Sequence, residues 1–167
     1  MGWVTLSLRN QAILGQRMEM EHQLMKINQR LMSLQSYASN VTNGVMNTGK
    51  PGWLGSAGII SPYERARFET DMFIRQNGML DPKTGKYYMV GKKGLAPISP
   101  QKIFLDFLHR ASNAYIEQLR EYLHKVEKKL THDRDQISTQ IKMLDAEYNA
   151  NKSAISNAIK ESAPQYV

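Results

Sequence analysis

The sequence predicts a mainly α-helical fold, in which long N- and C-terminal helices pack antiparallel as a helical hairpin or bundle. Apolar residues recur every seven positions from residue 3 to about 41, and neither glycine nor proline occurs from 101 to 163. Five of the eleven glycines fall within 44–58, between these two stretches. We therefore expect one elongated domain with three segments: an N-terminal assembly helix at 1–41, a Gly-rich loop, one short helix and a small β-hairpin at 42–99, and a long C-terminal helix at 100–167.

The N-terminal helix carries three parallel series of residues. The first series is apolar, the second is polar in its first half and apolar in its second, and the third is rich in methionine. Together they cover about 160° of the helix surface, which is wider than one partner helix can cover. Either the helix is buried in a bundle of its own chain, or it also meets neighbouring subunits. In order, the series are Leu6, Ile13, Met20, Ile27, Leu34 and Val41; Trp3, Asn10, Arg17, Leu24, Leu31 and Ala38; and Val4, Met18, Met25 and Met32, with Leu14 nearby.

The Gly-rich loop contains apolar residues on a backbone unsuited to a helix. Trp53 and Leu54 are the most prominent of them. A loop that carries such side chains is not expected to remain in water, so we expect it to order against its own fold or against a neighbouring subunit.

The short helix and the hairpin follow from local signals. Ser61, Pro62 and Glu64 form a capping box with proline at the first helical position, which predicts a helix from Pro62 to about Gln76. Turn residues at 81–85 lie between Met79-Leu80 and the strand-like stretch 86–90, and turn residues at 91–94 lie between that stretch and 95–98, which predicts a small hairpin or meander.

The long C-terminal helix begins at a second Ser-Pro pair, Ser99 and Pro100. Residues 127–136 are polar except for Leu130, and Asp133 could cap a new helix there. A break near residues 131–133 is the alternative, and continuity is favoured because no helix-breaking residue occurs.

Composition excludes several classes of function. The 22 Lys and Arg residues against 15 Asp and Glu give +7, but the excess is spread thinly, so nucleic acid is not favoured as a partner. The absence of cysteine excludes disulfides and thiolate sites. We find no apolar stretch of membrane-spanning length and no Sec-type signal.

Candidate catalytic and ligand sites are weak. The spacing of Gly44, Gly49 and Lys50 matches a phosphate-binding loop, but Pro51 replaces its Ser or Thr and no strand precedes it. His132 lies near Asp133 and Asp135, which a solvated charged patch explains better than a metal site does. We therefore expect no enzyme activity, no cofactor and no metal.

The chain resembles a known family over about 25 residues in all, mainly in the C-terminal helix. Residues 147–155, Glu-Tyr-Asn-Ala-Asn-Lys-Ser-Ala-Ile, are similar to the C-terminal pattern of bacterial flagellar rod and hook proteins, although Glu147 stands where that family usually has alanine. Residues 39–44 are similar to the segment after that family's first helix. The resemblance implies that the terminal helices pair as the inner core of a tube and that the intervening chain lies outside it.

The resulting hypothesis is a non-enzymatic structural subunit that homo-oligomerises through its terminal helices into a tube, ring or filament. It would belong to an extracellular appendage exported without a Sec-type signal, with other structural subunits as further partners. The alternatives are a phage virion protein, such as a neck or tail adaptor, and a helical nucleic-acid-binding adaptor. The expected assembly residues are Leu6, Ile13, Met18, Met20, Met25, Ile27, Met32, Leu34, Trp53, Leu54, Ile141, Leu144, Tyr148 and Ile155.

Overall fold

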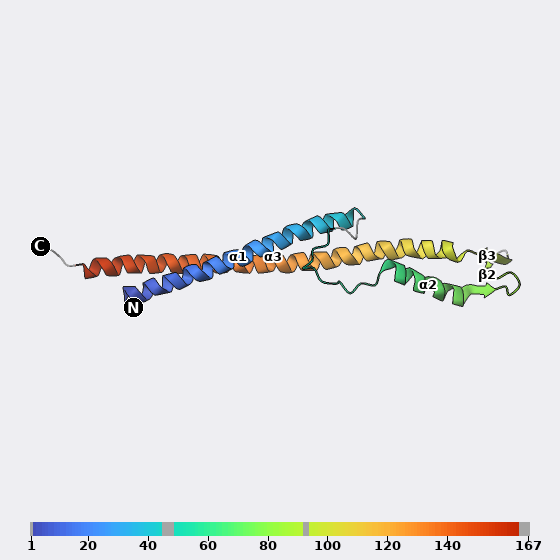
Figure 1. The fold of residues 1–167 in the computed structure, drawn as a ribbon, viewed down its shortest axis with the longest axis horizontal. Coiled ribbons are helices and arrows are strands. Elements are labelled where there is room, and N and C mark those ends of the chain that lie inside the picture. Colours follow the sequence, from blue (N-terminus) through green and yellow to red (C-terminus); the bar gives the residue numbers. More distant parts are fainter. Residues whose placement is uncertain (1, 45–48, 92–93, 164–167) are drawn as a thin grey trace. The chain divides into compact units, whose positions relative to one another are not determined.

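The computed structural model describes residues 2–44, 49–91 and 94–163 of the chain (Figure 1). Long terminal helices pack antiparallel and a small antiparallel sheet lies between them in the sequence, so the predicted fold class is confirmed. The sheet has three strands, which is the meander of the two predicted alternatives. In chain order, the elements of these residues are α1 (Trp3–Thr42), α2 (Pro62–Asn77), β1 (Gly78–Leu80), β2 (Tyr87–Gly91), β3 (Gly94–Ile98) and α3 (Pro100–Ser162).

Serine caps begin α2 and α3 as predicted. The Ser61 hydroxyl oxygen accepts a hydrogen bond from the backbone N–H of Glu64 at 3.3 Å. The Ser99 hydroxyl oxygen accepts one from the backbone N–H of Lys102 at 3.4 Å. Each cap satisfies one of the amides that a helix start leaves without an intrahelical partner.

Helix α3 is continuous from Pro100 to Ser162, including residues 131–133. The predicted continuity is therefore confirmed, and the alternative break is wrong. Residues 127–136 contain no Gly or Pro, their Lys, Glu, Arg and Gln residues lose little side-chain freedom in a helix, and Leu130 among them is buried.

The sheet is a meander in the order β1–β2–β3. Met79 of β1 pairs with Tyr88 of β2, and Val90 of β2 pairs with Leu95 of β3. The turn between β1 and β2 is closed by Asp81, whose carboxylate accepts hydrogen bonds from the Lys83 N–H and the Thr84 hydroxyl, both at 3.0 Å. Short-range turn chemistry therefore sets the register of the first strand pair.

The chain forms two compact units, and each long helix contributes to both. The terminal unit comprises Met1–Ser36 and Lys125–Val167, and the central unit comprises Tyr37–His124. Within the terminal unit, α1 runs antiparallel to the C-terminal half of α3 (Figure 1). The buried apolar side chains are Ile13, Leu31, Leu34 and Leu130 in the terminal unit, and Tyr37, Val41, Leu54, Ala66, Ala111, Leu119 and Leu123 in the central unit.

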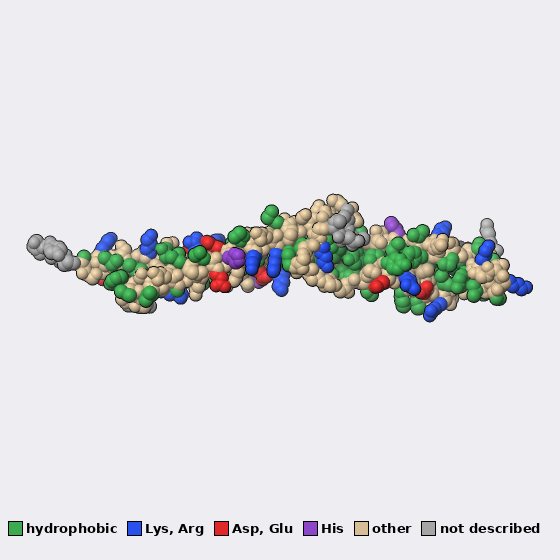
Figure 2. All heavy atoms as spheres, in the orientation of Figure 1, with side chains coloured by type: hydrophobic (Ala, Val, Ile, Leu, Met, Phe, Trp, Pro, Cys, Tyr) green, Lys and Arg blue, Asp and Glu red, His purple; other side chains and the backbone are tan. Residues whose placement is uncertain are grey.

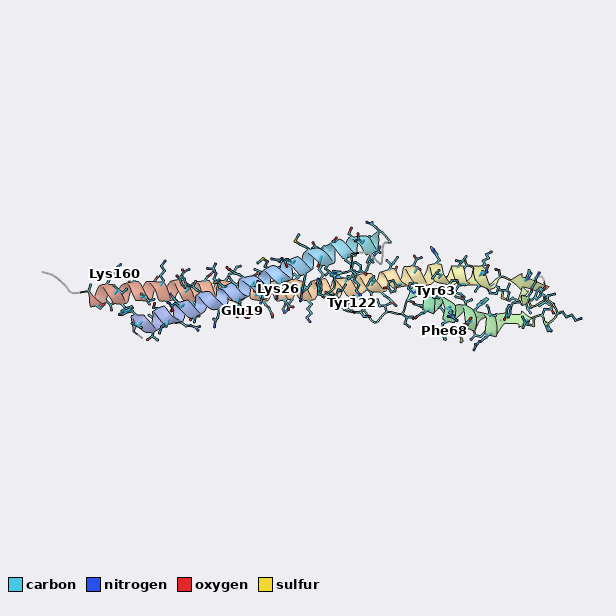
Figure 3. All side chains as sticks on the ribbon, in the orientation of Figure 1. Glu19, Lys26, Tyr63, Phe68, Tyr122 and Lys160 are labelled. Atoms are coloured by element: carbon cyan, nitrogen blue, oxygen red, sulfur yellow. The ribbon has the colours of Figure 1, made fainter. Side chains whose placement is uncertain are left out.

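In the central unit, α2 packs on the first turns of α3 through aromatic contacts. The rings of Tyr63 and Phe104 meet edge to face with centroids 5.4 Å apart, and those of Phe73 and Phe107 meet at 6.0 Å. On the face shown in Figure 2, hydrophobic side chains gather over the first half of α3 and the start of α2. Phe68 of α2 remains 66% exposed (Figure 3).

Candidate assembly surface

Within the terminal unit, α1 buries only part of its apolar surface. Ile13 and Leu34 of the first series are 0% and 1% exposed, and Leu31 of the second series is 8% exposed. The third series lies in water: Met18 and Met32 are both 71% exposed, and Met25 is 54% exposed. The fold therefore covers one side of the wide apolar surface and leaves the methionine side uncovered.

The polar half of the α1–α3 contact is held by a two-pronged ion pair. The Arg9 guanidinium donates from Nε to Oε1 of Glu147 at 2.8 Å and from Nη2 to Oε2 at 3.2 Å. The hydrogen bond from Arg9 lowers the pKa of the Glu147 carboxyl, and the same bond raises the pKa of Arg9. Both side chains are partly in water, so the pair orients the helices more than it stabilises them.

Two further polar residues lie along the same contact. Asn10 is 9% exposed, and its amide nitrogen donates weakly to the Tyr148 carbonyl oxygen at 3.5 Å, whereas its amide oxygen has no partner among the described residues. Arg17 Nε lies 3.2 Å from Glu21 and 3.1 Å from Asp145. The Arg17 Nε–H makes no hydrogen bond to either carboxylate, so both contacts are ion pairs only. A buried asparagine in an apolar seam is a common means of specifying helix register.

The uncovered side of α1 carries no charged residue. At 100° per residue, a sector about 100° wide centred on Met18 contains no Asp, Glu, Lys or Arg. Lys26 and Glu19, both labelled in Figure 3, lie beyond this sector on one side, at about 80° and 100° from Met18, and Glu21 lies beyond it on the other side, at about 60°. We call this sector the Met18 face; its residues in the terminal unit are Val4, Ser7, Gln11, Leu14, Met18, His22, Met25, Gln29, Met32 and Ser36.

The predicted assembly residues divide by environment. Met18, Met25 and Met32 are exposed together on the Met18 face. Ile13, Leu34 and Leu54 are buried by their own chain, so no neighbour can reach them in this conformation. The remaining predicted residues are half-buried: Leu6, Met20, Ile27, Trp53, Ile141, Leu144, Tyr148 and Ile155.

The sequence-based selection omitted two exposed members of the Met18 face, Val4 at 53% and Leu14 at 41%. The heptad spacing had already placed Val4 in the methionine series and Leu14 beside it, and only the list of assembly residues left them out. It also omitted an apolar groove between α2 and α3, bordered by Ile74, Phe104 and Leu105. That groove has no periodic signal, because its walls come from separate elements.

The Gly-rich loop packs within the central unit. Leu54 of the loop is 6% exposed, and the loop residues Lys50 to Ile59 help to enclose a cavity against Tyr37 of α1 and Tyr115 of α3. Ordering against its own fold, one of the two expected outcomes, therefore holds for Leu54. The glycine and lysine spacing from Gly44 to Lys50 lies partly outside the described residues, since 45–48 are not among them.

Metal and membrane sites are not found in the described part of the chain. No group of three or more His, Asp or Glu side chains there could hold a metal ion, and this includes the surroundings of His132. None of the helices in residues 2–44, 49–91 and 94–163 has the length and apolar character to cross a bilayer.

The chain matches no protein-family model, no curated protein and no solved structure. The fold and the Met18 face define a helical-hairpin protein whose N-terminal helix exposes methionines on a side without charged residues.

Proposed function

We propose that this protein is a non-enzymatic structural subunit that homo-oligomerises through its terminal helices into a tube, ring or filament. The observation that carries the proposal is the exposed, uncharged Met18 face. Isolated exposed apolar side chains are ordinary, but a row of them along one helix marks an interaction surface. Burying one such side chain fully stabilises by about 1.5–3 kcal/mol, so covering several together favours association.

The neutrality of the Met18 face favours a second copy of the same chain as its partner. Two copies of a charged face would repel, whereas two copies of an uncharged face can lie together without like-charge contacts. Methionine suits such a contact because its flexible thioether adapts to an opposing surface.

The charged edge of the face also suits a copy of itself. Glu19 and Lys26, both labelled in Figure 3, are seven residues apart and therefore lie on the same side of the face. When two identical helices pack antiparallel, residues on one edge meet residues on the same edge of the partner. A two-fold axis between positions 22 and 23 would bring Glu19 of each copy against Lys26 of the other, which are opposite charges.

A filament requires a second surface, since a two-fold contact closes on itself. On α3 of the terminal unit, Met143 is 66% exposed and Ile159 is 50% exposed. These side chains supply apolar surface for further copies or for other structural subunits.

The likeness of residues 147–155 to flagellar rod and hook proteins supports an appendage as the setting. Glu147, which replaces that family's usual alanine, supplies the carboxylate that Arg9 binds. A phage virion neck or tail adaptor would use the same surface and is the alternative setting. The net charge of +7 is the observation that favours a nucleic-acid-binding adaptor, the third hypothesis.

The test compares two variants that add the same negative charge to α1. Met25→Glu places it on the Met18 face, and Gln23→Glu places it about 160° away around the helix on an exposed position. Light scattering over a rising concentration series should show large oligomers for the parent and for Gln23→Glu, and smaller ones for Met25→Glu with its helical circular dichroism unchanged. A parent that stays monomeric at every concentration contradicts the proposal.

A charge exchange tests the antiparallel two-fold pairing. Glu19→Lys should weaken association by placing Lys against Lys26 of the second copy, and the double variant Glu19→Lys with Lys26→Glu should restore it. If the double variant associates no better than Glu19→Lys alone, the two edges do not meet in this way.

A further inference from the structure

The loop of the central unit encloses a cavity of about 230 Å³ that the assembly proposal does not use. Its walls come from three places: Tyr37 near the end of α1, Tyr115 and Tyr122 on α3 (Tyr122 is labelled in Figure 3), and the loop residues Lys50, Leu54, Gly55, Ser56, Ala57 and Ile59. Leu54 of the loop and Leu119 of α3 both line the cavity and are 6% and 4% exposed. The cavity is therefore formed by packed residues of one unit.

Every polar side chain that lines this cavity carries a hydrogen-bond donor. The titratable side chains among its lining residues are three tyrosines and one lysine, with no Asp, Glu or His among that lining. The Ser56 hydroxyl oxygen already accepts a hydrogen bond from the Gly58 N–H at 3.3 Å, so its own proton remains to be donated. Lys50 is exposed and can bring positive charge to the cavity without the cost of burying an ammonium.

The phenol of Tyr37 keeps its proton at neutral pH. Tyr37 is 3% exposed, and burial raises its pKa, with a smaller contribution from neighbouring Tyr115. A neutral phenol can donate a hydrogen bond to an anion, which a phenolate cannot do.

We propose that this cavity binds a small oxyanion, a carboxylate or a phosphate, with Lys50 supplying the charge and the hydroxyls of Tyr115 and Ser56 supplying hydrogen bonds. Hydrogen bonds to an ionised acceptor are about twice as strong as neutral ones, and the lining contains no carboxylate to repel the ligand. The volume is below the usual 300–1,000 Å³ of sites for drug-sized ligands, so it suits a small ion or one acidic group. The site is independent of the Met18 face.

The experiment is a calorimetric titration of the full-length chain with inorganic phosphate and, separately, with acetate, each at constant ionic strength against chloride. Saturable binding of either probe with one site per chain is expected, and the probe that binds more tightly identifies the group. Chloride controls for general screening of a protein with net charge +7. Absence of saturable binding by both probes overturns the proposal.

Variants locate the binding. Lys50→Gln should weaken it at least tenfold, and Tyr115→Phe, which removes only a hydroxyl, should weaken it several-fold. Lys83→Gln removes an exposed lysine from the β1–β2 turn, outside the lining, and should leave the affinity unchanged. Ser56→Ala gives a second loop variant if Tyr115→Phe alters the circular dichroism spectrum. Binding that Lys50→Gln and Ser56→Ala leave intact places the anion elsewhere and contradicts this site.

Discussion

Arg9 and Glu147 lie 138 positions apart in the chain and are joined by two hydrogen bonds, at 2.8 and 3.2 Å. The pair ties the second turn of α1 to the C-terminal half of α3, and Tyr148, the next residue of α3, accepts from Asn10, the next residue of α1. Consecutive residues on each helix thus meet across the contact, so this part of the structure has a defined register.

The ion pair predicts how stability changes with acid. Arg9 holds the pKa of the Glu147 carboxyl below its ordinary value of 4.5, so the folded chain binds this proton less readily than the unfolded chain does. The stabilisation is complete above the unfolded pKa and is lost as pH falls through the lowered folded pKa. Glu147→Gln should therefore reduce the fall in thermal midpoint between pH 7 and pH 3 by about 1–2 °C.

The matched control for this measurement is Glu161→Gln, which removes an exposed carboxylate near the end of the same helix. It should leave the pH dependence of the parent unchanged. If both variants reduce the pH dependence of the thermal midpoint equally, the reduction comes from the change in net charge and not from loss of the Arg9 contact.

We expect replacement of Asn10 by leucine to raise the free energy of unfolding. Its amide oxygen is buried without a partner among the described residues, and an unsatisfied buried polar atom is destabilising. Asn10→Leu removes both amide groups and adds apolar surface, so the free energy of unfolding should rise by about 1 kcal/mol. Urea denaturation measures this free energy. A loss of stability would show that the amide is better satisfied than its contacts indicate.

Removing the polar residue should also relax the helix register, which spin labels on α1 and α3 would detect as a broader distance distribution.

Local signals in the sequence were sufficient to predict the helices. The serine caps at Ser61 and Ser99 act within three residues, and the continuity of α3 follows from the absence of helix breakers. The sequence left a hairpin and a meander open because the three residues of Gly78–Leu80 are too few for a period-2 pattern, and they become a strand only by pairing with β2.

The candidate surface was only partly predictable, for a different physical reason. The sequence of α1 shows how wide its apolar surface is, but the rotation of α3 around it decides which part is covered. That rotation depends on contacts such as Arg9 to Glu147, between residues distant in the chain. The cavity near Tyr37 and Tyr115 could not be predicted either, because the two helices and the loop contribute to it separately.

We expect replacement of Gly15 by alanine to stabilise the fold. It lies in the interior of α1, and a Cβ added there meets no atom within 4 Å. Gly15→Ala should stabilise the chain by about 0.5–1 kcal/mol, because alanine restricts the unfolded chain more than glycine does, and raise the thermal midpoint by about 2–4 °C.

The same variant bears on the Met18 face, because Gly15 lies beside it on the helix. Light scattering on Gly15→Ala would show whether a neighbouring chain approaches the backbone there. Unchanged oligomers with higher helical stability are expected. A thermal midpoint below that of the parent would contradict the stability prediction.

We expect replacement of Gly78, where α2 ends and β1 begins, by alanine to destabilise the fold. Its backbone N–H donates to the Ile74 carbonyl oxygen, and a Cβ at this position would lie 2.6 Å from that same oxygen and 3.3 Å from the Ile74 Cγ2 atom. The backbone would have to shift, and the shift would disturb the pairing of Gly78 with Met89 in β2. Gly78→Ala should therefore lower the free energy of unfolding by about 1–3 kcal/mol.

Gly52→Ala is the control for this variant. A Cβ at position 52 meets nothing within 4 Å and φ there is not positive, so the free energy of unfolding should change by no more than about 0.5 kcal/mol. Urea denaturation of the two variants checks the difference, and equal stability would show that the helix end can move away from β1 at no cost.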